Sequence, residues 1–468
     1  MTTIATSAAA GRALTARLAE KVLSINASHL TPLALAQAKM CFVDAIGVTL
    51  AGRMENVTQI LLRTPGVASA PGRSLIFGTG IRTSALDAAL VNGTSSHALD
   101  YDDFSAIMGG HHTVPLMAPL VALAEEHALP GAKVLLAYVV GVEVEIRMAR
   151  ALGFHHYDKG WHPTSTLGTF GAAAAVAHLL ELDLAQTTTA LSIAASMAAG
   201  IKANFGTMVK PLHVGQCARG GLLAALLAER GFDANEFALE HSQGFLNVFN
   251  GPGTFDVGKL FEDWASPLEI EGASIALKQF PCCGSTHPAI TMMLRLVREE
   301  KISAGDVQRI EILPHGRRLR HTNTPYPQSS LEAKFSVQYV CARALLSGAV
   351  RLRDFEGEAY AEPEIRRLLE ITEARPHPDM PDDAAEQWGA DVIVWLKSGR
   401  RFSRRIDQLV GRGGDSPMTR DEMWDKFEDC AQRALARQRL PALFDLLQDL
   451  ETVPDINVLT QLLVAEPV

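Results

Sequence analysis

The chain has few cysteines, and their spacing matches no common metal or redox motif. The six are Cys41, Cys217, Cys282, Cys283, Cys341 and Cys430, and no C-x-x-C pair occurs among them. Cys282 and Cys283 are adjacent, and adjacent cysteines rarely bridge each other because the geometry is strained. The pattern supports neither a zinc ribbon nor a thioredoxin-type site. Reduced thiols in a cytoplasmic protein are the best interpretation.

Dense basic segments and long apolar segments are also missing. The formal net charge of −9 and the lack of any Lys/Arg run argue against a nucleic-acid partner. The same charge argues against attraction to an anionic membrane. No uninterrupted apolar run reaches the roughly 18 residues that a membrane span needs. The first twenty residues have no acid before Glu20 and faintly resemble a transit peptide, but an irregular start to a first helix is the favoured interpretation.

Several catalytic signatures are absent as well. No G-x-G-x-x-G or Walker loop is present, so the sequence implies no nucleotide cofactor. No G-x-S-x-G elbow is present, which argues against a serine hydrolase. Histidines and aspartates could supply metal ligands, yet no H-E-x-x-H or H-x-H spacing occurs. We therefore predict chemistry without a cofactor and without a metal, with metal catalysis as a minor alternative.

The pattern that is present predicts a mainly α protein of two domains. A chain of 468 residues exceeds what one hydrophobic core usually supports. We expect a helical domain over residues 1–265, onto which residues 408–468 pack back, and an α+β lid over residues 266–407. Helical spacing is expected over 114–128, 132–150, 167–181, 186–199, 215–231, 286–300 and 331–347. Strands are expected at 307–313 and in a hairpin over 392–405, with a flexible link at 411–417.

The most informative segment runs from His97 to Pro115. Three acids, Asp100, Asp102 and Asp103, precede a Gly-Gly pair and then His111–His112. Polar titratable residues between apolar helices are costly to bury without partners. They gather where proton or metal chemistry takes place. The alternative is a polar interhelical loop whose acids cap the next helix.

Four further segments share this character, because each places titratable groups at the end of an element beside Gly or Pro. They are 155–166, 204–215, 278–288 and 332–339. Each alone could be structural: Tyr339 could be a core residue, and Cys282 and Cys283 small buried hydrophobes. Together they favour acid–base chemistry on carboxylates. Lysines bind carboxylates and stabilise enolate-like charge, while His, Asp and Tyr transfer protons.

These segments resemble the MmgE/PrpD family. The motifs are H-A-L-D-Y-D-D, G-H-H, G-W-H-P-T-S-T-L-G, N-F-G-T-M-x-K-P-L-H-x-G, K-x-F-P-C-C-x-x-x-H-P and F-S-V-Q-Y. The family includes 2-methylcitrate dehydratase, cis-aconitate decarboxylase and iminodisuccinate epimerase. The resemblance covers nearly the whole chain. It implies a large helical domain with an α+β lid, a homodimer, and a site between the domains.

Similarity to the decarboxylase-type pocket implies a set of site residues. The catalytic set is Asp100, His112, His162, Lys210, Lys278 and Tyr339. His111 could take the place of His112, and Phe104 stands where the decarboxylase pattern has threonine. Tyr157 resembles the epimerase branch. The substrate-binding set is Phe104, His111, Tyr157 and His213.

The resulting prediction is a cofactor-independent lyase. It would dehydrate or decarboxylate a small di- or tricarboxylate by acid–base chemistry. The alternative is an epimerase or isomerase of an aspartate-like dicarboxylate such as iminodisuccinate.

Overall fold

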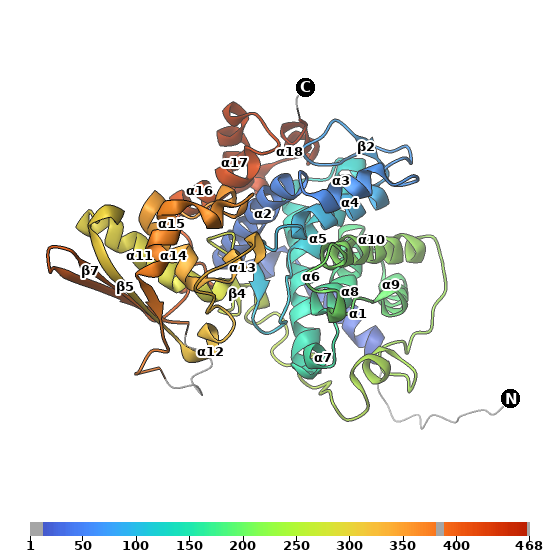
Figure 1. Ribbon diagram of the computed structural model, residues 1–468. Coiled ribbons are helices and arrows are strands. Elements are labelled where there is room, and N and C mark those ends of the chain that lie inside the picture. The colour runs from blue at the N-terminus through green and yellow to red at the C-terminus, as the bar shows by residue number, and fades with distance from the viewer. Residues whose placement is uncertain (1–12, 381–387, 466–468) are drawn as a thin grey trace.

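The computed structural model describes residues 13–380 and 388–465. Most of the N-terminal segment with the transit-peptide resemblance lies outside these residues. Figure 1 shows a helical body and, beside it, a smaller part that carries a sheet. Helix accounts for 56% and strand for 8% of the described residues, which confirms the mainly α fold with a small sheet region.

The body is built from helices of the first half of the chain. Two short antiparallel pairs accompany them, β1 (Ser74–Leu75) with β2 (Arg82–Thr83) and β3 (Phe104–Ser105) with β4 (Ile275–Ala276). The helices are α1 (Leu14–Ser24), α2 (Pro32–Gly52), α3 (Asn56–Arg63), α4 (Ala85–His97), α5 (Val114–His127), α6 (Gly131–Leu152), α7 (His155–Asp158), α8 (Pro163–Leu179), α9 (Leu184–Met197) and α10 (Val209–Glu229).

Helix α2 lies inside the body. Its first turn is capped by Thr31, whose side chain accepts a hydrogen bond from the Ala34 amide, and Pro32 occupies the first turn. By length and composition it is apolar enough to cross a membrane, but 72% of the relevant window is buried inside the protein. It packs against α4 and against the C-terminal helices α16 (Arg420–Ala431) and α17 (Leu440–Gln448), as a core helix does.

The smaller part, called the lid here, is an α+β unit with its own hydrophobic core. Its sheet has the order β6-β5-β7-β8, in which only β5 and β6 are parallel. The strands are β5 (Val307–Pro314), β6 (Thr372–Ala374), β7 (Ala390–Leu396) and β8 (Arg401–Ile406). The helices are α11 (His287–Glu300), α12 (Gly316–Leu319), α13 (Ser330–Lys334), α14 (Val337–Ser347) and α15 (Pro363–Glu370).

The C-terminal tail returns to the body, where α16 and α17 pack against α2, and α18 (Asn457–Leu462) packs against α17 (Figure 1). One core cluster contains Phe42 of α2 together with Phe427 and Phe444 of the tail. The link at 411–417 is hydrogen-bonded rather than free. The Leu277 amide donates to the Gly411 carbonyl at 2.9 Å, and the Gly413 amide donates to the Ile275 carbonyl at 2.8 Å.

Three helices begin at places that the hydrophobic pattern did not indicate. α8 begins at Pro163 and α10 at Val209, in both cases earlier than expected, because polar residues interrupt the apolar spacing in their first turns. The single helix expected over 331–347 is divided into α13 and α14, since Ser336 caps α14 by accepting from the Tyr339 amide at 3.1 Å. These earlier starts matter because they carry His162 and Lys210.

Candidate active site

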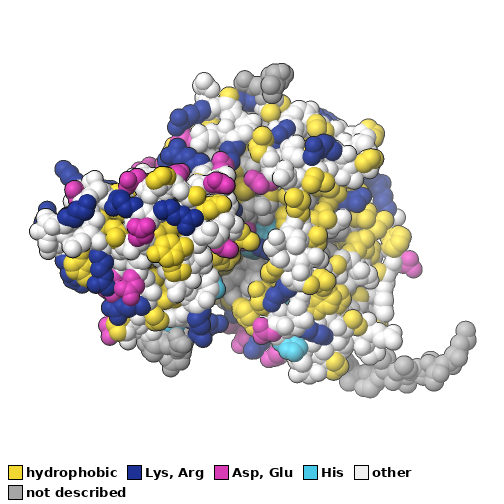
Figure 2. Space-filling view, viewed as in Figure 1, with side chains coloured by type: hydrophobic (Ala, Val, Ile, Leu, Met, Phe, Trp, Pro, Cys, Tyr) yellow, Lys and Arg dark blue, Asp and Glu magenta, His cyan; other side chains and the backbone are white. Residues whose placement is uncertain are grey.

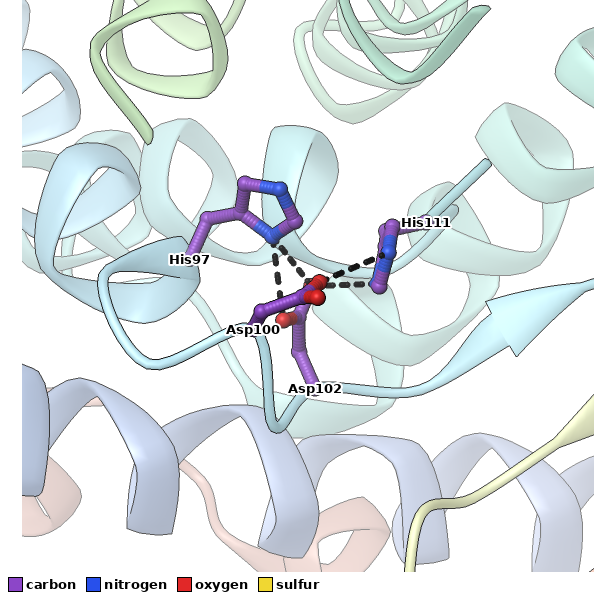
Figure 3. A group of neighbouring side chains, drawn as sticks. All are labelled: His97, Asp100, Asp102 and His111. Atoms are coloured by element: carbon purple, nitrogen blue, oxygen red, sulfur yellow. Dashed lines mark hydrogen bonds and ion pairs between the residues drawn. The ribbon is translucent and has the colours of Figure 1, made fainter. Parts of the chain in front are cut away.

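The end of α4 and the loop after it form one wall of the candidate site. His97 is the last residue of α4, and Asp100 follows with φ of +52°. This left-handed conformation is uncommon for a residue with a side chain, although aspartate tolerates it better than most. In Figure 3 the side chains of His97, Asp100, Asp102 and His111 converge on one small volume.

Asp102 lies between two imidazoles. Its Oδ2 is 2.9 Å from Nδ1 of His97 and 2.9 Å from Nδ1 of His111, and its side chain is fully buried. Burial alone would raise the pKa of this carboxyl, but the two histidines outweigh burial and hold the pKa well below its usual range. Asp102 therefore stays ionised and orients both rings.

Asp100 is surrounded by cations. Its Oδ1 lies 2.9 Å from Lys210 Nζ, 3.3 Å from Lys278 Nζ and 3.3 Å from His111 Nε2. The Lys278 ammonium also donates to the Asp100 carbonyl. Desolvation by the surrounding residues acts to raise the pKa of Asp100, yet the positive charges of Lys210 and Lys278 hold it well below the ordinary value. The Asp100 side chain is 48% exposed, so solvent reaches the site here.

The structure distinguishes the two adjacent histidines. His111 faces Asp100 and Asp102, and its amide donates to Thr164 Oγ1 at 3.0 Å. Gly110 permits this approach, because a Cβ there would lie 2.8 Å from the Thr164 nitrogen. His112 points the other way and is fully buried. His112, which was expected in the catalytic set, therefore lies away from the cluster of His97, Asp100 and Asp102. His111, the alternative for that place, lies in the cluster.

The environment of His112 consists of Cys41 and Asp103. Its Nε2 lies 3.9 Å from the Cys41 sulfur, and its Nδ1 lies 3.6 Å from an oxygen of Asp103. Burial lowers the pKa of His112 to about 3, so the ring is neutral near pH 7.

His162 and His213 extend the wall beside His97. His162 precedes Pro163 at the start of α8, and its amide donates to the Gly200 carbonyl at 3.0 Å. Its Nδ1 is 3.2 Å from Nδ1 of His213, so one of these nitrogens carries a hydrogen and the other accepts it. The His162 ring centre lies 5.9 Å from that of His97.

These histidines are neutral at physiological pH. Burial lowers the pKa of His97 to about 4, although Asp102 opposes the shift. Burial and the charge of His97 lower the pKa of His162 much further, and burial with the Lys210 charge lowers that of His213. The site therefore combines ammonium groups that bind anions with neutral imidazoles that can accept protons.

The remaining predicted residues divide into two groups. Tyr157 lies beside the site, where burial raises its pKa and the charges of Asp158 and Asp100 add to the shift. The Lys202 ammonium lies 3.3 Å from the centre of its ring. The half-buried Phe104 ring is 6.4 Å from that of Trp388 in the lid. Tyr339 is not at the cluster: it lies in the lid core, where its hydroxyl donates to the Asp354 carbonyl and accepts from Arg343 Nε at 2.9 Å.

Four residues of the site were not among those predicted. His97 and Asp102 lay within the acidic and histidine-rich segment, and their spacing of five residues was the available signal. Phe205 packs its ring edge-on against His162 at 4.9 Å. Lys334, at the end of α13, brings a third ammonium group from the lid. Burial lowers its pKa, Asp100 opposes the shift, and Lys278 adds to it.

Within residues 13–380 and 388–465, two groups of residues could hold a metal ion by composition. They are His97, Asp100, Asp102 and His111, and the buried set Cys41, Asp103 and His112. In the first group, two ammonium groups already contact Asp100. Like charges repel across a few ångströms, so this arrangement favours an anionic ligand over a cation.

The site draws its residues from both parts of the molecule, and the space-filling view shows the surface hollowed between them (Figure 2). Lys278 follows β4 and Lys334 ends α13 of the lid, whereas the imidazoles come from the body. Comparison with known families then settles the relationship. The MmgE/PrpD N-terminal domain matches residues 16–257, and the MmgE/PrpD C-terminal domain matches residues 280–449.

The chain belongs to the MmgE/PrpD family.

Relatives within this family align over almost the whole chain. The chain is 31% identical to human cis-aconitate decarboxylase, with 97% of this chain and 95% of the relative covered. It is 30% identical to the mouse cis-aconitate decarboxylase over 97% and 93%. A cis-aconitate decarboxylase of Aspergillus terreus is 24% identical over 92% and 91%. The protein is thus an MmgE/PrpD-type lyase.

Proposed function

We propose that this MmgE/PrpD lyase removes carbon dioxide or water from a small tricarboxylate, and that decarboxylation of cis-aconitate is the first reaction to test. The observation that carries the proposal is the convergence of Lys210, Lys278 and His111 on one carboxylate oxygen of Asp100. A substrate carboxylate offers these donors the same charge and geometry. The names of the relatives favour a tricarboxylate.

The residues have distinct roles in this proposal. Lys210, Lys278 and Lys334 bind substrate carboxylates. When carbon dioxide leaves, the electron pair it leaves behind spreads toward a neighbouring carboxylate, and the ammonium groups stabilise that charge. Both ring nitrogens of His111 face carboxylate oxygens, so Nε2 can give up or take a proton while Nδ1 stays paired with Asp102. The neutral His97 and His162 rings complete the wall.

We further propose that the reaction needs no cofactor or metal. The support is the pair of ammonium groups at Asp100, which favours an anion in the site. Activity should survive dialysis against a chelator, and elemental analysis should find no stoichiometric metal. A metal at one equivalent whose removal abolishes turnover would overturn this part of the proposal.

The decisive assay is a substrate panel. The protein would be incubated with cis-aconitate, citrate, methylcitrate, tartrate and iminodisuccinate in D2O and followed by NMR. Lys210→Met should lower kcat/KM on the substrate that turns over by about 100-fold or more, because a charge-assisted contact in the transition state is lost. Lys133→Met is the matched control, since Lys133 pairs with Glu181 on the exposed surface of the body. Equal activity of the two variants would refute the assignment.

An epimerase is the second candidate, favoured by one observation. Tyr157 lies half-buried beside the site within the field of Asp100, where a phenol could exchange a proton with a substrate carbon. Deuterium incorporation at the α-carbon of iminodisuccinate, without loss of carbon dioxide or water, would select this reaction over the lyase.

A further inference from the structure

Behind the site lies a buried ion pair that no step of the proposed chemistry uses. Lys426 of α16 contacts Asp44 of α2, and their side chains are 3% and 0% exposed. Burying two charges is costly, and such a pair contributes little net stability compared with apolar residues of similar volume. Its geometry therefore calls for another explanation.

The ammonium group of Lys426 holds both segments that form the carboxylate-binding group. It donates to the Tyr101 carbonyl at 2.8 Å and to the Lys278 carbonyl at 2.7 Å. Tyr101 follows Asp100 directly, and the second carbonyl belongs to Lys278 itself. One side chain of the C-terminal tail thus ties the backbone beside Asp100 to the backbone of Lys278.

The other groups of this network act in the same direction. Asp44 Oδ2 accepts from the Asp103 amide at 3.1 Å, which fixes the loop a second time. The Tyr101 hydroxyl donates to the Gln279 carbonyl at 2.9 Å, and the Lys426 ammonium lies 4.0 Å from the centre of the Tyr101 ring. These contacts join the loop after α4, the segment after β4, the tail and α2 to one another.

We propose that Lys426, with Asp44 as its counter-ion, is a positioning residue that sets the distance between Asp100 and Lys278. It does not touch substrate. It acts by holding the two backbones so that the left-handed Asp100 presents its carboxylate to the lysines. The inference rests on the proposed function, because it takes Lys278 as a substrate-binding group.

The test compares a double variant with a matched control. Asp44→Asn with Lys426→Met removes the donor to both carbonyls without leaving an unpaired buried charge, which alone could unfold the protein. Lys39→Met is the control, because Lys39 of α2 also pairs with the tail, through Glu451 at 2.7 Å, but contacts neither loop. A single Lys426→Met variant provides a second reading if it folds.

Two measurements decide the outcome. Hydrogen exchange of the ligand-free protein should be at least about tenfold faster in peptides covering 98–105 and 276–281 of the double variant than in Lys39→Met. The reason is that loops no longer held at their carbonyls open to solvent more often, which exposes their amides. On the substrate identified by the panel, KM should rise at least about tenfold with a smaller change in kcat, as expected when binding groups move. Melting curves of both variants give the stability baseline.

The failures are distinguishable. Unchanged exchange in the two loops would overturn the inference whether or not a substrate is known. Faster exchange with unchanged KM and kcat would show a structural contact only, and would also overturn it. If wild-type protein turns over nothing on the panel, the proposed function fails while the exchange experiment still decides whether Lys426 fixes the loops.

Discussion

Replacement of each of the two adjacent histidines by alanine should have opposite consequences. His111 faces the ionised Asp100 and Asp102, whereas the fully buried His112 packs against Cys41 and Asp103. His111→Ala should therefore remove activity with little loss of stability. His112→Ala should do the reverse.

The magnitudes follow from the two environments. A positioned general acid or base contributes about 10²- to 10⁴-fold in rate, so His111→Ala should raise the barrier by about 3–5 kcal/mol. The His111 side chain is 11% exposed and its removal opens space toward solvent rather than a sealed cavity. His112→Ala empties a buried site, and truncation of a buried ring-sized side chain costs about 2–4 kcal/mol of unfolding free energy.

The assay pairs initial rates with denaturant unfolding of both variants. Rates would be measured by NMR on the substrate that the panel identifies, and unfolding by circular dichroism in urea. The reasoning fails if His111→Ala keeps wild-type kcat/KM while His112→Ala loses it at wild-type stability. In that case the loop would have to change conformation when substrate binds, so that His112 enters the site in place of His111.

Three further predictions follow from other sites. Tyr339→Phe should lower unfolding free energy by about 1–3 kcal/mol, because the Asp354 carbonyl and Arg343 lose a buried partner, while kcat/KM stays nearly unchanged; a selective loss of rate would contradict the placement of Tyr339. Burial lowers the pKa of His287 to about 3, so the unfolding free energy of the wild-type protein falls as the pH drops below the unfolded-state pKa of about 6.5. Between pH 7.5 and pH 5, the unfolding free energy of His287→Asn should therefore rise by about 2 kcal/mol relative to that of the wild type. The same difference between the two proteins at both pH values would refute this. The family resemblance predicts a homodimer, which light scattering coupled to size-exclusion chromatography would test, and a monomer at micromolar concentration would contradict it.

Much of the fold could be predicted because periodicity reports burial. The helices at α5, α6 and α9 and the strands β5, β7 and β8 all appear where apolar spacing indicated them. Helix starts were less visible. The first turns of α8 and α10 contain polar residues that face the site, so their apolar pattern begins only after them.

The identity of the site residues was partly visible and partly not. The acidic loop and the lysines stand out by composition, whereas the choice between His111 and His112 depends on which way a loop turns. That turn is set where Gly110 approaches Thr164 closely and the His111 amide donates to Thr164 Oγ1. His111 and Thr164 are 53 residues apart, so no local sequence pattern reports their contact. Tyr339 was predicted at the site but lies in the lid core. Its hydroxyl bonds there with Asp354 and Arg343, which are 15 and 4 residues away.

The return of the tail to the body also determines when during biosynthesis the site can form. Lys426 bonds with the Tyr101 carbonyl across 325 residues and with the Lys278 carbonyl across 148. A chain leaving the ribosome from its N-terminus exposes Asp44 and both loops long before Lys426 is made. Until then the carboxylate of Asp44 has no counter-ion from α16, and α2 has no cover on that side. Nascent chains arrested before α16 should therefore form their helical segments but no working site. Chaperones should stay bound longest at the face of α2 that α16 covers in the finished protein.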